Sequence, residues 1–92
     1  MIKSFVDRQT KAIYEGKWVK RFQSFHEQAE RRLQILDSAI SLNDLKKLPS
    51  NRFEVLKGNR KGQYSIRINK QWRICFRWQD NEVYDVEIVD YH

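Results

Sequence analysis

The residues best suited to moving protons at neutral pH are the two histidines, His26 and His92. His92 is the final residue of the sequence and directly follows Asp90 and Tyr91. Nearby carboxylates stabilise a protonated imidazole and orient its ring, which suits general acid–base catalysis. Chain ends often fray, but Val89 and its neighbours can hold this one in a strand. His26 falls beside the apolar face of a predicted helix, so we interpret it as structural.

Positive charge is concentrated in one part of the sequence. The chain has a net charge of +6, and residues 46 to 77 contain ten Lys or Arg but only one acidic residue, Glu54. Arg67, Arg73 and Arg77 alternate along two predicted strands, so we expect their side chains on one face of a sheet. Arginines in this arrangement can contact successive phosphates of a nucleic acid, although a run of charges is more often just a solvated surface.

Several enzyme chemistries have no residues here to carry them. The sequence has no glycine-rich phosphate loop, no GxSxG motif and no Cys/His cluster, and Cys75 is its only cysteine. We therefore expect no metal, no cofactor and no disulfide within the chain. RNA supplies its own nucleophile, the 2′-hydroxyl, so its cleavage needs a base, an acid and cations that stabilise the charge on the phosphorane. The candidate residues could perform this metal-free chemistry.

Length and hydropathy indicate one soluble domain spanning residues 1 to 92. No apolar run approaches the roughly 20 residues that cross a bilayer. The N-terminus, "MIKSFVDRQTK", lacks the apolar stretch of a secretion signal. Together with the single cysteine, these features predict a cytoplasmic protein that does not bind membranes.

The elements that must position the reactive groups begin with helices. Asp7 is a candidate N-cap for a helix over about residues 8 to 15. Ser41 and Asp44 resemble a capping box and predict a short helix at about 42 to 47, before Pro49. Between these two, apolar residues spaced three and four apart predict one helix from 20 to 40, with a buried face formed by Phe22, Phe25, Ala29, Leu33, Leu36 and Ile40.

The second half of the sequence predicts a sheet. Residues 2 to 6 could form a short first strand, and further strands are expected at 53–56, 63–69, 72–78 and 82–89. The last three are joined by connections short enough to require hairpins, so they should pair antiparallel. Alternation predicts a core face containing Tyr64, Ile66, Ile68, Trp72, Ile74, Phe76 and Trp78.

These elements together predict an α+β fold, in which N-terminal helices pack on a twisted antiparallel sheet of three to five strands. One face of the sheet should rest on the helices, and the other should be free. The free face would carry the three alternating arginines.

Three stretches of the sequence, "MIKSF", "LKGNRKGQYSIRINKQWRICFRW" and "VEIVDYH", closely resemble the HigB toxins of the RelE/ParE superfamily, which belong to type II toxin-antitoxin systems. The "G-x-x-S-I-x-x-x-x-x-W-R-I" pattern and the ending "DYH" are the most specific parts of this likeness. The resemblance implies a RelE-like fold and ribosome-dependent cleavage of messenger RNA in the ribosomal A site. It also implies neutralisation by a HigA-type helix-turn-helix antitoxin.

The resemblance assigns roles to individual positions. Arg73 of "QWRICF" matches the family's arginine and would stabilise charge on the scissile phosphate. Asp90, Tyr91 and His92 match its C-terminal catalytic group: His92 would give or take a proton, Tyr91 would orient the RNA or shift a proton, and Asp90 would position the others. Glu54 completes the candidate catalytic set, although better-known members carry a histidine there. The remaining cations would hold ribosomal and messenger RNA: Arg52, Lys57, Arg60, Lys61, Arg67, Lys70 and Arg77.

Glu54 leaves two alternatives open. A glutamate side chain is ionised at neutral pH, so Glu54 could be the base while His92 is the acid. Alternatively, Glu54 is a structural partner of Arg52 or Arg73, and the active site consists of His92 with Tyr91.

Two other functions also fit the sequence. The ParE branch of the superfamily inhibits DNA gyrase without cutting nucleic acid, and helix-then-sheet order alone would suit it equally. An inactive RNA-binding relative would keep the basic face, with Glu54 marking a lost catalytic centre.

Overall fold

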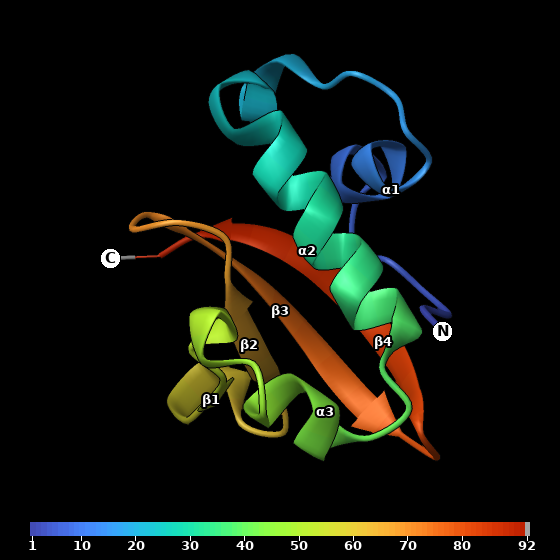
Figure 1. The fold of residues 1–92 in the computed structure, drawn as a ribbon, viewed down its shortest axis with the longest axis vertical. Coiled ribbons are helices and arrows are strands. Elements are labelled where there is room, and N and C mark those ends of the chain that lie inside the picture. The colour runs from blue at the N-terminus through green and yellow to red at the C-terminus, as the bar shows by residue number, and fades with distance from the viewer. Residues whose placement is uncertain (92) are drawn as a thin grey trace.

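Helices come first along the chain and an antiparallel sheet follows (Figure 1). The computed structural model describes residues 1 to 91. Its α-helices are α1 (Arg8–Tyr14), α2 (His26–Ser38) and α3 (Leu42–Lys46), with 3-10 helices at Lys20–Phe25, Pro49–Asn51 and Gly58–Arg60. Its strands are β1 (Glu54–Val55), β2 (Tyr64–Arg67), β3 (Trp72–Gln79) and β4 (Glu82–Asp90), which form an antiparallel sheet in that spatial order. The predicted α+β architecture is confirmed.

Local hydrogen bonds begin two of the helices where the sequence predicts. At the start of α1, Asp7 Oδ1 accepts the N–H of Thr10 at 2.6 Å. At the start of α3, Ser41 Oγ accepts the N–H of Asp44 at 3.3 Å, and Asp44 Oδ2 accepts the N–H of Ser41 at 3.2 Å. The capping box is confirmed, and each bond satisfies an N–H that the first helical turn leaves without a partner.

The prediction of one helix from 20 to 40 was wrong at both ends. The first turns form a 3-10 helix, and the α-helix begins only at His26. At the other end, Ala39 has an extended backbone and Ile40 is 75% exposed. The N–H of Ile40 donates to Asp44 Oδ2 at 3.0 Å. Ile40 is therefore bonded to the first turn of α3 and does not continue α2. Ile40 therefore does not belong to the core.

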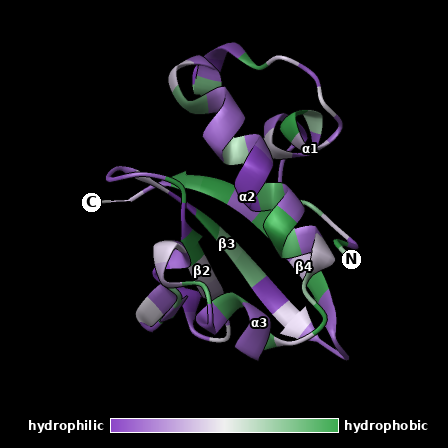
Figure 2. Ribbon diagram, in the orientation of Figure 1, coloured by the Kyte–Doolittle hydropathy of each residue, from purple (hydrophilic) through white to green (hydrophobic). Residues whose placement is uncertain are grey.

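The core lies between the helices and one face of the sheet, and α2 runs across that face (Figure 1). Figure 2 shows hydrophobic residues along much of β4, whereas the β2–β3 turn is hydrophilic. The ring of Trp72, on the predicted core face of β3, stacks on Phe25 with 4.9 Å between centroids. The core face predicted for β2 and β3 is confirmed. Buried core residues include Phe22, Ala29, Leu33, Leu36, Ile66, Ile74, Phe76, Val83, Val86 and Ile88.

A β-bulge interrupts the pairing of β3 with β4. The register shifts between Cys75 and Arg77, and Asp85 on β4 has a positive φ of 53°. The extra residue changes the alternation of β4, so Val83 and Val86 are both buried in the core although they lie three positions apart.

The N-terminal residues do not form the regular first strand that the sequence predicts. Ile2 and Phe5 instead make single parallel bridges to Val83 and Val86 of β4. The bulge lies between these two bridges and breaks the continuity of the ladder. The prediction was wrong about the element, although these residues do lie along the sheet edge.

The sheet face away from the helices is not free at its centre, contrary to the prediction. Ser65, Arg73 and Cys75 are all buried there. The chain that leads into β1 contacts this face, where the main-chain oxygen of Arg52 accepts a hydrogen bond from Arg73. Burial raises the pKa of the Cys75 thiol, so it stays protonated and is a poor nucleophile. Within residues 1 to 91, no helix is both long and apolar enough to cross a membrane.

Candidate active site

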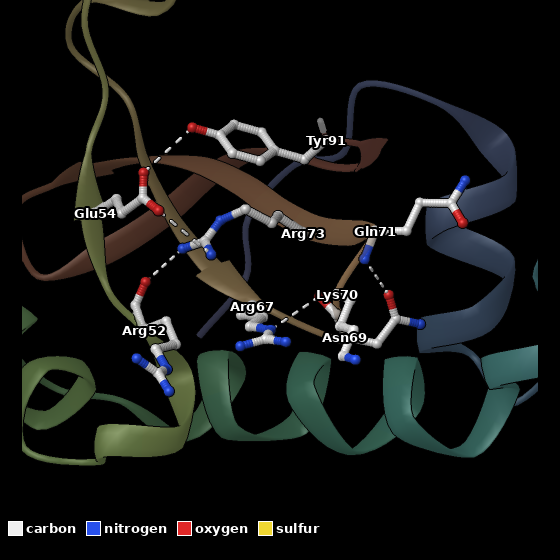
Figure 3. Close-up of a pocket in the computed structure, with 8 residues that line it drawn as sticks. All are labelled: Arg52, Glu54, Arg67, Asn69, Lys70, Gln71, Arg73 and Tyr91. Atoms are coloured by element: carbon white, nitrogen blue, oxygen red, sulfur yellow. Dashed lines mark hydrogen bonds and ion pairs between the residues drawn. The ribbon is translucent and has the colours of Figure 1, made fainter.

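An open hollow of about 720 Å³ lies on the sheet face away from the core. β1, the β2–β3 turn, the start of β3 and the residue after β4 all contribute to it (Figure 3). Four of its side chains are cationic and one is a carboxylate, so a phosphate would meet favourable charge there. The lining residues are Arg52, Glu54, Arg67, Asn69, Lys70, Gln71, Arg73 and Tyr91.

Arg73 is the most deeply placed cation of the hollow, with a side chain only 6% exposed. Its Nε donates to Ser65 Oγ at 2.8 Å, and its Nη2 donates to the main-chain oxygens of Arg52 and of Ser65, the latter at 3.4 Å. A buried guanidinium needs such acceptors, because removing its charge from water is otherwise very unfavourable. These contacts fix the orientation of the guanidinium within the sheet face.

Glu54 lies on the same face, because its strand partner is Ser65 and paired residues share a face. Its Oε1 lies 3.5 Å from Arg73 Nη1, and its Oε2 accepts the hydroxyl of Tyr91 at 3.3 Å (Figure 3). The Glu54 side chain is 43% exposed, so solvent reaches the carboxylate. Of the two partners that the sequence suggests for Glu54, the structure pairs it with Arg73.

Tyr91, the residue after β4, contacts both Arg73 and Glu54 and forms a cluster with them. Its ring lies over the guanidinium of Arg73, with 5.4 Å between Cζ and the ring centroid, and the side chain is 39% exposed. Its N–H donates to the main-chain oxygen of Gln71 at 2.6 Å, so the chain is held to the sheet at this residue. His92 lies outside the described residues, and its role as proton donor or acceptor stays a prediction.

Asp90 is not among the residues that line the hollow. In the β3–β4 register it pairs with Trp72, whose ring packs on the helical side of the sheet. Asp90 Oδ2 accepts a hydrogen bond from Gln71 Nε2 at 3.1 Å. Its predicted positioning role would therefore act through its neighbours along the chain.

The predicted RNA-binding cations fall into three groups. Arg52, Arg67 and Lys70 line the hollow already described. A second hollow of about 470 Å³ shares Glu54 and Tyr91 with the first and also contains Lys57 and Arg60. The other two, Lys61 and Arg77, line neither hollow, and Arg77 forms an ion pair with Asp85 at 3.4 Å.

Arg52 adopts the left-handed region, with φ 45° and ψ 52°, at the end of the Pro49–Asn51 turn. This conformation is uncommon for residues other than glycine, and here it accompanies a main-chain oxygen that faces Arg73. Asn51, which precedes it, is fully buried: Arg32 Nη1 donates to its Oδ1 at 2.6 Å, and its Nδ2 donates to the oxygen of Leu45 at 3.1 Å. The left-handed turn is thus anchored to α2 and α3.

Sequence reasoning missed Ser65, Asn69, Gln71 and the main chain of Arg52 as parts of the site. Ser65 lies within the G-x-x-S-I pattern, which was a signal that could have pointed to it. His26 lies away from the hollow, with Nε2 3.0 Å from the main-chain oxygen of Lys17. That contact agrees with a structural role for His26.

Comparison with known proteins identifies the family. Residues 3 to 92 match the model for HigB-like toxins, described as the RelE-like toxin of type II toxin-antitoxin system HigB. The chain belongs to this family. Two curated relatives are similar to this HigB-like toxin. Toxin HigB-1 of Vibrio cholerae is 43% identical over 73% of this chain and 82% of that protein, and Endoribonuclease HigB of Proteus vulgaris is 30% identical over the whole of both.

Solved structures show that the HigB-like toxin has the RelE-like fold. A YoeB–YefM toxin-antitoxin complex from Staphylococcus aureus contains a chain that matches it with a TM-score of 0.59 and 22% identity, over 100% of this chain and 98% of that one. A YafQ variant from E. coli matches with a TM-score of 0.59 and 14% identity, over 98% and 93%. The predicted RelE-like fold is confirmed.

Proposed function

We propose that this HigB-like toxin is a ribosome-dependent endoribonuclease that cuts messenger RNA in the A site and thereby stops translation and growth. The observation that carries the proposal is the cluster of Arg73, Glu54 and Tyr91 in a cationic hollow. The relative from Proteus vulgaris that is named an endoribonuclease supports it. The chain would act in the cytoplasm, as one domain over residues 1 to 92 and without a cofactor.

In the proposed reaction, Glu54 takes the proton of the RNA 2′-hydroxyl. The 2′ oxygen bonds to the adjacent phosphorus and the bond from phosphorus to the 5′ oxygen breaks, which leaves a 2′,3′-cyclic phosphate. His92 gives a proton to the departing 5′ oxygen. This division suits the residue types, because a glutamate is ionised at neutral pH whereas an imidazolium can donate a proton.

Arg73 would stabilise the extra negative charge that develops on the phosphorane. Its Nη1 faces Glu54 and carries two N–H groups, so it has a donor for a phosphate oxygen as well. Charge stabilisation by a fixed donor is strong where water is partly excluded. Tyr91 would orient Glu54 through its hydroxyl and offer its exposed ring to a base of the RNA.

The other cations would bind messenger and ribosomal RNA through phosphates. Arg52, Arg67 and Lys70 flank the cluster on one side, and Lys57 and Arg60 flank it on the other. Contacts of this kind add affinity together and weaken together in salt, so no single one should be essential. Lys61 and Arg77 would contact RNA outside the two hollows.

A HigA-type helix-turn-helix antitoxin is the proposed partner in the cell. The likeness to a YoeB toxin solved in complex with the YefM antitoxin supports an antitoxin partner. Binding of such a partner would stabilise a small domain by mass action.

Primer extension on a defined message in a purified translation system tests the proposed function. Wild type, Arg73→Ala and a chain lacking His92 would each be assayed with and without ribosomes. Cuts by wild type alone, and only with ribosomes, are the expected result. Intact messages together with inhibited DNA gyrase would instead favour the ParE-like function, and intact messages without growth arrest would favour an inactive relative.

A further inference from the structure

Ser65 is a buried polar residue at the site to which the proposed reaction gives no role. It lies in the middle of β2, between Glu54 on β1 and Cys75 on β3, and its exposure is 0%. Its hydroxyl oxygen is 2.8 Å from Arg73 Nε, and its main-chain oxygen is 3.4 Å from Arg73 Nη2. One residue therefore contacts two different nitrogens of the guanidinium.

One side of the Arg73 guanidinium is hydrogen-bonded to the protein, and the other side faces the hollow. Nε and Nη2 donate to Ser65 Oγ, to the Ser65 main-chain oxygen and to the Arg52 main-chain oxygen. Nη1 makes the ion pair with Glu54 on the hollow side (Figure 3). A guanidinium is planar, so fixing Nε and Nη2 also fixes the direction in which Nη1 points.

We propose that the Ser65 hydroxyl is a positioning group for the reaction, because it holds Arg73 Nε so that Nη1 points at the scissile phosphate. This inference rests on the proposed ribonuclease function. Both main-chain oxygens accept from Nη2, whereas the Ser65 hydroxyl oxygen accepts from Nε. Loss of the hydroxyl leaves Nε–H buried without that acceptor, and the guanidinium rotates toward other acceptors such as Glu54.

A rotated Arg73 would affect the transition state more than RNA binding. The other cations of the two hollows hold the RNA in the proposed mode, whereas the side-chain hydrogen bonds described for Ser65 come from Arg73. Misplacing one catalytic group by about an ångström can lower a rate roughly a hundredfold. Ser65→Ala should therefore lower kcat by about ten- to a hundredfold and leave KM within about twofold.

A matched control separates positioning from general stability. Thr10 is also 0% exposed, and its hydroxyl accepts the N–H of Ile88 at 3.1 Å on the helical side of the sheet. Thr10→Val likewise removes a buried hydroxyl acceptor and keeps the side-chain volume. We expect it to lower the melting temperature without changing kcat at a temperature where it is folded.

The test is ribosome-dependent cleavage with kcat and KM measured for wild type, Ser65→Ala, Thr10→Val, Arg73→Lys and the double variant Ser65→Ala/Arg73→Lys. Lysine lacks the guanidinium Nε–H that the Ser65 hydroxyl accepts. The double variant should therefore be no slower than Arg73→Lys alone. Ser65→Thr retains the hydroxyl and should recover most of the kcat that Ser65→Ala loses.

The results distinguish the two levels of the proposal. If wild type cuts RNA and Ser65→Ala keeps its kcat, or loses the same factor in the Arg73→Lys background, the positioning role is wrong and the ribonuclease function stands. If wild type does not cut, the function fails and the role of Ser65 with it. Should Ser65→Ala fail to fold, the Arg73 Nε–H resonance of wild type decides by NMR: slow exchange with water supports the bond to Ser65, and rapid exchange contradicts it.

Discussion

Replacing Glu54 with glutamine gives the sharpest test of the proposed chemistry. Glutamine keeps the shape of the side chain and an oxygen that can accept the Tyr91 hydroxyl, now 3.3 Å from Oε2. It removes the negative charge 3.5 Å from Arg73 Nη1 and the ability to take a proton at neutral pH. The variant therefore changes charge and basicity with little change of packing.

The effect on stability follows from the distance and the exposure of the pair. Two unit charges 3.5 Å apart interact by about 1 kcal/mol at the dielectric constant of water and about 5 kcal/mol at a value of 20. The Glu54 side chain is 43% exposed, so screening by water favours the lower end, about 1 to 2 kcal/mol. For a domain of this size, that loss lowers the melting temperature by roughly 4 to 16 °C.

The effect on catalysis should be larger than the effect on stability. A general base contributes about 10²- to 10⁴-fold to a rate, which is about 3 to 5 kcal/mol of barrier. Glu54→Gln should lose this factor in kcat, and KM should stay the same or fall, because a negative charge leaves the cationic hollow. The assay is ribosome-dependent cleavage at a temperature below the melting point of the variant.

A second carboxylate provides the control for Glu54. Glu87 pairs with Arg60 Nη1 at 3.2 Å and is 28% exposed, so Glu87→Gln removes a comparable ion pair beside the second hollow. We expect it to keep kcat within about threefold of wild type, since it removes no base. Full kcat in Glu54→Gln would refute the assignment of Glu54 as base and leave it as a partner that orients Arg73.

Three further predictions follow from particular contacts. Arg52→Gly keeps the left-handed backbone and its main-chain bond to Arg73, so it should raise KM and weaken the salt dependence with little loss of kcat. Arg52→Ala should melt below Arg52→Gly by calorimetry, because alanine keeps the strain that arginine carries at φ 45° and glycine relieves it. Tyr91→Phe keeps the ring over Arg73 but loses the hydroxyl that donates to Glu54, so kcat in the cleavage assay should fall severalfold while the melting temperature changes little. The N–H of Ile40, followed by that of Ser41, holds the pKa of Asp44 below its ordinary value of 3.8. The stability that this carboxylate contributes is therefore present above pH 3.8 and is lost as pH falls through the lowered pKa of the folded state. In thermal melts between about pH 5 and 2, the melting temperature of Asp44→Asn should fall less with acid than that of wild type.

Features that depend on neighbouring residues in the sequence were predictable. The capping box of Ser41 and Asp44 involves residues three apart, and it forms as expected. Alternation along β2 and β3 identified the face that contains Ile66 and Ile74 because strand geometry has a fixed period of two. The end of α2 was harder to predict, since the start of α3 competes for Ile40.

The same period of two predicts that Asp90 and Tyr91 point to opposite faces of the sheet, so the sequence alone could have separated their roles. Consecutive residues of a strand point to opposite faces, so these two could not both project toward Arg73 from a regular strand. The resemblance to HigB toxins groups them as one catalytic set, and the register places Asp90 opposite Trp72 on the helical side.

The burial of Arg73 depends on contacts that sequence periodicity does not encode. Its acceptors include the main-chain oxygen of Arg52, 21 positions away, which faces Arg73 from a left-handed turn. That turn depends on Asn51, whose side chain bonds to Arg32 of α2 and to the main chain of Leu45. Such a chain of tertiary contacts becomes visible only once the helices and the sheet are packed together.

The buried thiol of Cys75 gives this protein a built-in reporter of transient opening. It is the only cysteine in the sequence, it is fully covered, and it pairs across the sheet with Ser65, which holds Arg73. An alkylating reagent can react with it only while this sheet face is open, so the rate of labelling measures the population of open molecules when reclosing is fast. Without any engineered labelling site, that rate would show whether RNA, ribosomes or an antitoxin keep this face closed.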